Sequence, residues 1–256
     1  LSDHANLIQD MSNLHDIQYL PIEVRSIDEG VRYPVGLPVF TVKATVDGYG
    51  WLVNYLETMT SNLIWPMLNT ATKVEQLYLQ AKHYGELSAP ADIIENWLPI
   101  CVHEFGLRGY WGPEAGIRTS SAHSLFFLGS DTIAVLDFFE DSYDTNPDEE
   151  PIAVSIRASE HADISRMLSL FRHLATKAIA AGEYMYTNTG ERIDPQEVLD
   201  DTELFVLQWF IENSTGIMSY VSDTEDYYRL INVYAAKLKD KIEARQARED
   251  GQPPIF

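Results

Sequence analysis

The sequence predicts an α/β protein with parallel strands in its core and a small antiparallel β layer at its start. Its 256 residues, 45% of them hydrophobic and 11% aromatic, are enough to bury a core. Short apolar runs alternate several times with segments of helical periodicity, which is typical of parallel strands joined by helices. β-branched and aromatic residues concentrate near the start of the chain, as they do in antiparallel strands.

The expected β layer occupies residues 19–27 and 31–45, which follow a short polar lead. Gly30 and nearby prolines mark the turn between the two segments. We therefore expect residues 1–50 to form a β-rich portion and residues 51–256 to form the α/β portion.

The α/β portion begins with a helical pattern from Trp51. We expect Pro66 to break or kink this helix, because proline lacks the N–H of a helical hydrogen bond, and residues 71–84 to continue as a helix. Later helices are predicted at residues 114–127, 133–143, 162–181, 203–213 and 226–248, and strands at residues 98–102, 151–156 and 216–222.

Residues 183–201 are an expected insertion in the α/β portion. The Asn-Thr-Gly sequence at residues 188–190 predicts the turn of a hairpin. Asp194 followed by Pro195 predicts the start of a helix, since aspartate is a good N-cap and proline suits the first turn.

The chain is strongly acidic, with 18 Lys and Arg residues, 39 Asp and Glu residues and a formal net charge of −21. Such a charge repels phosphate backbones and anionic lipids, so we expect neither a nucleic acid nor a membrane as a partner. No signal-peptide pattern is recognisable, and no apolar run approaches the roughly 20 residues of a spanning helix. The single cysteine, Cys101, fits a reducing compartment. These features together predict a cytoplasmic protein.

Ligands of parallel α/β proteins collect beyond the carboxyl ends of the strands, which directs attention to four polar segments. These are residues 103–109, 129–132, 155–161 and 219–223. No P-loop lysine motif, G-x-S-x-G elbow, H-E-x-x-H pair or pair of cysteines accompanies them, and we assign no metal ligands.

Three residues of the first two segments have both a functional and a structural interpretation. Arg108, between two glycines, could bind a phosphate or lie on a surface turn. Phe105 could stack on a flat ring or belong to the core. Asp131 could accept a hydrogen bond from a ligand amide, or it could join Ser130 in capping a helix that begins at Ile133.

His161 and Asp223, in the other two segments, leave the same choice open. His161 could act as a general acid or base or contact a phosphate, or it could simply begin a helix. Asp223 could hold a sugar hydroxyl or a metal-bound water, or it could cap the helix that follows. No single motif decides between these interpretations.

Seven segments in the same order give the chain a resemblance to nicotinamide phosphoribosyltransferases. Two of them are LPIEVRSIDEGVRYPVGLPVF at residues 20–40 and WLVNYLETMTSNLIWP at residues 51–66. The others are HEFGLRG at residues 103–109, residues 115–117 with 121–123, GSDT at residues 129–132, residue 155 with 159–161, and SYVSDTED at residues 219–226. The resemblance implies part of a type II phosphoribosyltransferase fold, which is an irregular α/β barrel beside an antiparallel β domain. It also implies a homodimer with active sites at the subunit interface.

The resemblance implies a nicotinamide pocket built from four side chains. Phe105 would stack on the pyridine ring, and Asp131 would accept a hydrogen bond from the carboxamide N–H. Ser155 and Ser219 would line the same pocket.

The resemblance places three other residues around the ribosyl donor. Arg108 would bind a phosphate of the donor. His161 would be the catalytic histidine beside the pyrophosphate, and Asp223 would hold the ribose end as a second catalytic residue. The implied cofactor is Mg²⁺, and ATP is an implied activator in members that couple the reaction to its hydrolysis.

The expected reaction joins nicotinamide to 5-phosphoribosyl 1-pyrophosphate, giving nicotinamide mononucleotide and pyrophosphate in NAD salvage. Two alternatives stay open: transfer to ADP-ribose pyrophosphate, which would give NAD directly, and a non-catalytic nicotinamide-binding or assembly subunit. Because the family pattern continues beyond both ends of this chain, we expect a longer polypeptide or a companion chain to supply the remaining segments.

Overall fold

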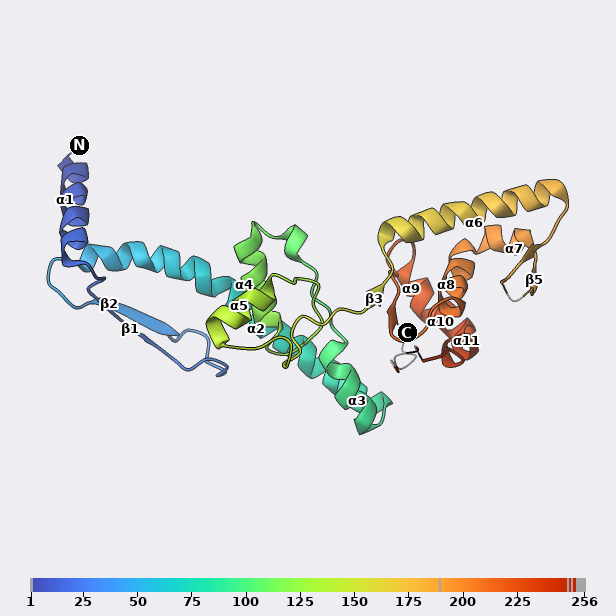
Figure 1. Cartoon of the computed structure of the whole chain (residues 1–256), viewed down its shortest axis with the longest axis horizontal. Helices are drawn as coiled ribbons and strands as arrows, with labels where there is room; N and C mark the ends of the chain where they lie inside the picture. The colour runs from blue at the N-terminus through green and yellow to red at the C-terminus, as the bar shows by residue number, and fades with distance from the viewer. Residues whose placement is uncertain (1, 189, 248, 250, 252–256) are drawn as a thin grey trace. The chain divides into compact units, whose positions relative to one another are not determined.

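A computed structural model describes residues 2–188, 190–247, 249 and 251. The chain divides into two compact units, residues 1–154 and 155–256, each with its own hydrophobic clusters. Both units consist mainly of helices, and each also contains short paired strands (Figure 1). The predicted mixture of α and β structure is confirmed. The described residues form no closed barrel, so the barrel portion and the boundary at residue 50 stay predictions.

The first unit holds two strands and most of the long helices. Its elements are α1 (Ser2–Ile17), β1 (Ile22–Ser26), β2 (Phe40–Ala44), α2 (Gly50–Ser88), α3 (Ala91–Trp97), η1 (Leu98–Ile100), η2 (Leu107–Gly109), α4 (Pro113–His123) and α5 (Val135–Tyr143). Strands β1 and β2 are antiparallel with Val24 opposite Val42, which confirms the predicted β layer. Helix α1 replaces the expected polar lead. Half-buried Leu7, Leu14 and Ile17 follow helical spacing there, a pattern too sparse to stand out among polar residues.

Helix α2 is one continuous helix of 39 residues that contains Pro66, so the predicted break at this proline is wrong. The proline ring leaves the carbonyl group of Asn62 without its helical donor. Because Asn62 is exposed, water can hydrogen-bond this carbonyl. The structural cost of the proline is therefore small enough for the helix to continue.

The strand predicted at residues 98–102 is also wrong, since α3 runs into the 3-10 turn η1. Leu98 is buried with Ile94, Val74 and Phe127, so the apolar run packs as helical turns. A short apolar run cannot distinguish a buried strand from a buried helix segment, and Pro99 favours the start of a helical turn.

Parallel pairing in the first unit is limited to single contacts around Leu128–Asp131. The Glu104 N–H donates to the Gly129 carbonyl at 3.0 Å, and the Asp131 N–H donates to the Glu104 carbonyl at 2.8 Å. On the other edge, the Val154 N–H donates to the Leu128 carbonyl at 2.7 Å and the Val154 carbonyl accepts the Ser130 N–H at 3.1 Å, so the strand predicted at residues 151–156 is reduced to a single bridge at Val154. Three segments are thus aligned in parallel, with the predicted direction but without the predicted length.

The second unit contains two helices that meet face to face. Its elements are β3 (Arg157–Ala158), α6 (His161–Ala181), β4 (Met185–Tyr186), β5 (Arg192–Ile193), α7 (Pro195–Asp200), α8 (Thr202–Glu212), β6 (Met218–Ser219), α9 (Tyr227–Arg229), η3 (Leu230–Tyr234), α10 (Ala235–Lys237) and α11 (Lys239–Glu243). Helix α6 packs on α7 and α8 (Figure 1). Ile164 and Leu168 of α6 are buried against Val206 of α8, which confirms the helices predicted at residues 162–181 and 203–213.

The C-terminal helix predicted at residues 226–248 is interrupted, and residue 248 lies outside the described residues. A π-helical turn at η3 keeps Leu230, Tyr234 and Leu238 buried in one cluster with α8. The helix then breaks at Leu238, where the backbone has φ −99° and ψ 10°. The strand predicted at residues 216–222 is likewise reduced to β6, which pairs in parallel with β3.

The insertion folds as predicted in the residues that the structure describes. Strands β4 and β5 form an antiparallel hairpin, and Gly190 has φ +84°, which a glycine adopts without strain. Residue 189 of the predicted turn lies outside the described residues. Asp194 is the N-cap of α7, and its Oδ1 accepts the Gln196 N–H at 2.8 Å.

We expect Asp194→Ala to lower the free energy of unfolding by about 1 kcal/mol, because it removes this N-cap hydrogen bond. Urea unfolding followed by circular dichroism measures the change. Asp200→Ala is the matched control, since it removes only an exposed side-chain hydrogen bond to the same Gln196. Equal losses in the two variants would contradict the capping role.

None of the described helices combines the length with the apolar character that a bilayer span requires.

Candidate functional site

Two predicted site residues of the first unit lie at the point where two segments pair. Glu104 pairs with Ser130, so Phe105 and Asp131 are the next residues of their segments. His103 Nε2 lies 3.2 Å from Asp131 Oδ1, and the His103 and Phe105 ring centroids are 6.4 Å apart. These contacts place His103, Phe105 and Asp131 on one side of the paired segments.

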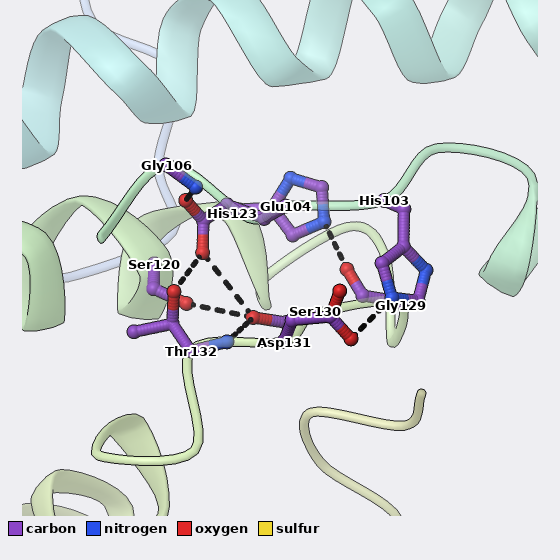
Figure 2. Close-up of polar contacts among 9 residues, drawn as sticks. All are labelled: His103, Glu104, Gly106, Ser120, His123, Gly129, Ser130, Asp131 and Thr132. Atoms are coloured by element: carbon purple, nitrogen blue, oxygen red, sulfur yellow. Dashed lines mark hydrogen bonds and ion pairs between the residues drawn. The ribbon is translucent and has the colours of Figure 1, made fainter. Parts of the chain in front are cut away.

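The Glu104 carboxylate occupies the other side, where it is surrounded by hydroxyl groups (Figure 2). Its Oε1 accepts the Gly106 N–H at 2.6 Å, and its Oε2 accepts the Thr132 hydroxyl at 2.6 Å and the Ser130 hydroxyl at 3.3 Å. Ser130 Oγ lies 3.1 Å from Ser120 Oγ of α4. We call Glu104, Gly106, Ser120, Ser130 and Thr132 the Glu104 network.

Helix α4 also contacts residues 128–131, the middle one of the three parallel segments, through His123. The His123 Nε2 donates to the Gly129 carbonyl at 2.9 Å (Figure 2). Burial lowers the pKa of His123, although the Gly129 hydrogen bond and the charge of Glu104 oppose the shift. Gly129 must be a glycine in this arrangement, because a Cβ would lie 2.6 Å from His103 Nδ1 and 3.0 Å from the Val102 carbonyl oxygen.

The structure bears on the structural interpretations of Phe105 and Asp131. Phe105 is 63% exposed and therefore does not belong to the core. The Asp131 side chain is 47% exposed, and helix α5 begins only at Val135 with Ala134 as its N-cap, so Asp131 is not the N-cap of α5. Arg108 is exposed in the short turn η2, where both of its interpretations remain open.

His161 and Asp223 come together in the second unit. Their side chains meet with His161 Nε2 2.9 Å from Asp223 Oδ1, and they are 55% and 68% exposed. His161 is the first residue of α6, and Glu160 is the N-cap. Asp223 is not a cap either, since Asp226 caps α9 and its Oδ1 accepts the Arg229 N–H at 3.0 Å.

The β3–β6 pair positions this second group. Ala158 pairs with Ser219, and the Ser159 N–H donates to the Ser219 carbonyl at 3.0 Å. Buried Ser159 Oγ also accepts the Val221 N–H at 2.8 Å, which holds the segment before His161 against the segment before Asp223. Ser219 is exposed at this pair, whereas Ser155 is exposed ahead of β3.

Three similar proteins share one name. The nicotinamide phosphoribosyltransferase of Acinetobacter baylyi is 27% identical over 247 residues, which are 94% of the chain and 41% of that protein. The nicotinamide phosphoribosyltransferase of Xanthomonas campestris pv. campestris is 30% identical over 169 residues, 64% of the chain and 34% of that protein. The one of Mycoplasma pneumoniae is 28% identical over 135 residues, 52% of the chain and 29% of that protein.

The chain is similar to part of the nicotinamide phosphoribosyltransferases. This confirms the resemblance predicted from the seven segments. The chain spans about two fifths of the length of the A. baylyi protein, 41%. No protein-family model matches the chain.

Within the segments shared with nicotinamide phosphoribosyltransferases, sequence reasoning assigned no role to His103 or Glu104. Both residues follow the apolar run at residues 98–102. This position alone indicates no function. Their partners lie more than twenty residues away along the chain, at Ser130, Asp131 and Thr132. Only the pairing of the two segments brings them into contact.

The second unit also contains an acidic group that no motif indicated. Glu203 in the first turn of α8 is only 5% exposed. Burial raises its pKa to about 7, and the charges of Glu225, Asp226 and Asp201 add to the shift, which Arg229 opposes. Among the described residues, no group of three or more His, Cys, Asp or Glu side chains could hold a metal ion.

Proposed function

We propose that the chain serves in a nicotinamide phosphoribosyltransferase of NAD salvage. The observation that carries the proposal is the exposed Phe105 ring on the same side of the paired segments as the Asp131 carboxylate, in a chain similar to enzymes of that name. In this reaction nicotinamide and 5-phosphoribosyl 1-pyrophosphate give nicotinamide mononucleotide and pyrophosphate.

Phe105 and Asp131 offer the contacts that nicotinamide needs. An exposed aromatic face can stack on the pyridine ring, and a carboxylate can accept a hydrogen bond from the carboxamide. The contact with His103 Nε2 orients the Asp131 carboxylate. The ring nitrogen of nicotinamide is then held as the nucleophile.

His161 and Asp223 offer contacts for the donor. The pyridine nitrogen lone pair forms the new bond to the anomeric carbon, and the carbon–oxygen bond to pyrophosphate breaks with its electron pair. His161 would contact the departing pyrophosphate, Asp223 would hold the ribose and orient the imidazole, and Arg108 would bind a donor phosphate. Ser155 and Ser219 would line the nicotinamide pocket with Phe105 and Asp131.

Mg²⁺ is part of the proposal as an ion that arrives with the donor. Mg²⁺ binds through one or two carboxylates and substrate phosphates, and an exposed carboxylate such as that of Asp223 would supply one such contact. When bound, it would neutralise charge on the pyrophosphate. Activation by ATP, a homodimer and a companion chain are further parts of the proposal.

We expect Asp131→Ser to reduce the preference for nicotinamide over nicotinate by at least about tenfold. A carboxylate accepts the amide N–H of nicotinamide but repels the carboxylate of nicotinate, whereas a serine does neither strongly. The preference is the ratio of the rates of mononucleotide formation with nicotinamide and with nicotinate. Both rates are measured on the protein in the form that its source organism produces, with and without the substitution. Asp141→Ser, which removes an exposed aspartate from α5, is the control.

Two results would contradict the proposal. If the unmodified protein forms no mononucleotide from nicotinamide, ribosyl donor and Mg²⁺, the proposed reaction is wrong. If it uses both substrates equally, the role of Asp131 is wrong.

A further inference from the structure

The Glu104 carboxylate contacts both segments that carry the proposed nicotinamide-binding side chains. It accepts hydrogen bonds from Gly106 N–H, from the Thr132 hydroxyl and from the Ser130 hydroxyl (Figure 2). The first of these belongs to the segment of Phe105, and the other two belong to the segment of Asp131. One side chain therefore ties the two segments together.

The positions of these contacts follow a simple rule. Glu104 and Gly106 are the neighbours of Phe105, and Ser130 and Thr132 are the neighbours of Asp131. Asp131 thus lies between two residues that the Glu104 carboxylate holds, and Phe105 lies between Glu104 itself and Gly106, which the carboxylate also holds. The backbone hydrogen bond from Asp131 N–H to the Glu104 carbonyl, 2.8 Å long, fixes the register of the two segments.

The Glu104 network leaves the carboxylate little room to move. Ser120 and Thr132 are fully buried, and Ser130 Oγ accepts the Thr132 N–H at 3.1 Å while it contacts Ser120. A Cβ at Gly106 would lie 2.8 Å from Glu104 Oε1. A larger residue at this position would therefore have to displace the carboxylate, so the network is closely packed.

We propose that Glu104 is a positioning residue that fixes the distance between the Phe105 ring and the Asp131 carboxylate. A flat ring with an amide at its 3-position can then make both contacts at once, and this selectivity rests on the proposed function. A carboxylate suits the task because its two oxygens accept three hydrogen bonds, and hydrogen bonds to a charged acceptor are stronger than neutral ones. Glutamine has a single acceptor oxygen in its side-chain amide and cannot reproduce all three.

A positioning role differs measurably from a general structural role. Loss of fixed spacing weakens ligands that use both contacts, but it has little effect on a ligand that only stacks. Partial unfolding weakens both kinds of ligand equally. Nicotinamide and 3-methylpyridine form a suitable pair of probes, because they share the ring and differ in the amide.

The experiment is an NMR titration with both probes. Each probe is added to the unmodified protein, in the form that its source organism produces, and to three variants of it. We expect Glu104→Gln to lower the affinity for nicotinamide by about tenfold and that for 3-methylpyridine by less than about threefold. Thr132→Val, which removes the hydroxyl donor at nearly constant volume, should act in the same direction. Glu75→Gln is the matched control, because Glu75 is a half-buried glutamate of the same unit that pairs instead with Arg32.

Each other outcome has a defined meaning. Equal losses for the two probes, or no loss in Glu104→Gln, would overturn the positioning role. If the unmodified protein does not bind nicotinamide, the proposed function fails, and amide hydrogen exchange then tests the network separately. Exchange at Gly106 N–H should be about tenfold faster in Glu104→Gln if the carboxylate holds this segment, and unchanged exchange would overturn the network as well.

Discussion

Replacing His161 by alanine is expected to lower kcat by about a thousandfold while the affinity for nicotinamide changes less than about twofold. The imidazole contacts the Asp223 carboxylate at 2.9 Å, and in the proposed reaction it faces the departing pyrophosphate. In the proposed function, nicotinamide binding depends instead on Phe105 and Asp131. Steady-state kinetics and nicotinamide titration on the same preparation separate the two quantities.

Two controls make the His161 result specific. His173→Ala removes an exposed histidine from the same helix α6 and should leave kcat unchanged. Asp223→Asn keeps a hydrogen-bond acceptor beside the imidazole but removes the charge, so its effect should be smaller than that of His161→Ala. Because Glu160 is the N-cap of α6, the loss of stability in His161→Ala should stay below about 0.5 kcal/mol. Retained turnover would show that His161 has no catalytic role.

The second large effect concerns the pH dependence of stability. We expect Glu203→Gln to raise the free energy of unfolding at pH 8 by up to roughly 3 kcal/mol and to have little effect at pH 5. Burial raises the pKa of Glu203 to about 7 in the folded chain, against 4.5 for an exposed glutamate. Ionisation of this buried side chain at pH 8 therefore opposes folding, and glutamine avoids it.

The sign follows from proton binding. Between pH 4.5 and 7 the folded state holds a proton on Glu203 that the unfolded state releases, so stability falls as pH rises through this range. Below this range both states are protonated, and above it the penalty is constant. Urea unfolding at several pH values measures the difference between the unmodified protein and the variant.

Glu212→Gln is a matched control for this prediction. Glu212 lies on the same helix α8 but forms an ion pair with Lys241 at 2.6 Å. Its replacement removes a favourable contact, so this variant should be no more stable than the unmodified protein at pH 8. A gain of stability in both variants would point to the total charge of −21 as the cause, in place of the burial of Glu203.

Sequence patterns predicted the helices with strong local signals and failed where tertiary packing decides. Helix α6 has a regular apolar face that includes Ile164 and Leu168, and the Asp-Pro start of α7 is a local capping signal. The run at residues 98–102 carries no such signal, since apolar residues there satisfy a strand and a buried helical turn equally well. Its outcome depends on Phe127 and Val74, which are distant in sequence.

In the candidate site, too, local sequence signals predicted some features and tertiary pairing decided the others. The rule that ligands collect at strand ends drew attention to Phe105 and Asp131, which the structure places on the same side of paired segments. The contact of His103 with Asp131 and the Glu104 network depend on the register between residues 104 and 130, which a single sequence does not reveal. The role of each site residue stays a prediction until the variants are measured.

Pro66 affects the bending stiffness of helix α2. A helix resists bending partly through its ladder of backbone hydrogen bonds, and the ladder lacks the bond between Asn62 and Pro66. Bending stiffness is therefore lowest at this turn. The half of α2 that follows Pro66 contributes Val74 to the hydrophobic cluster that contains Phe127. Phe127 is close in sequence to Ser130. A bend at Pro66 would redirect the first half of α2 relative to the second half, which stays packed through Val74 and Phe127.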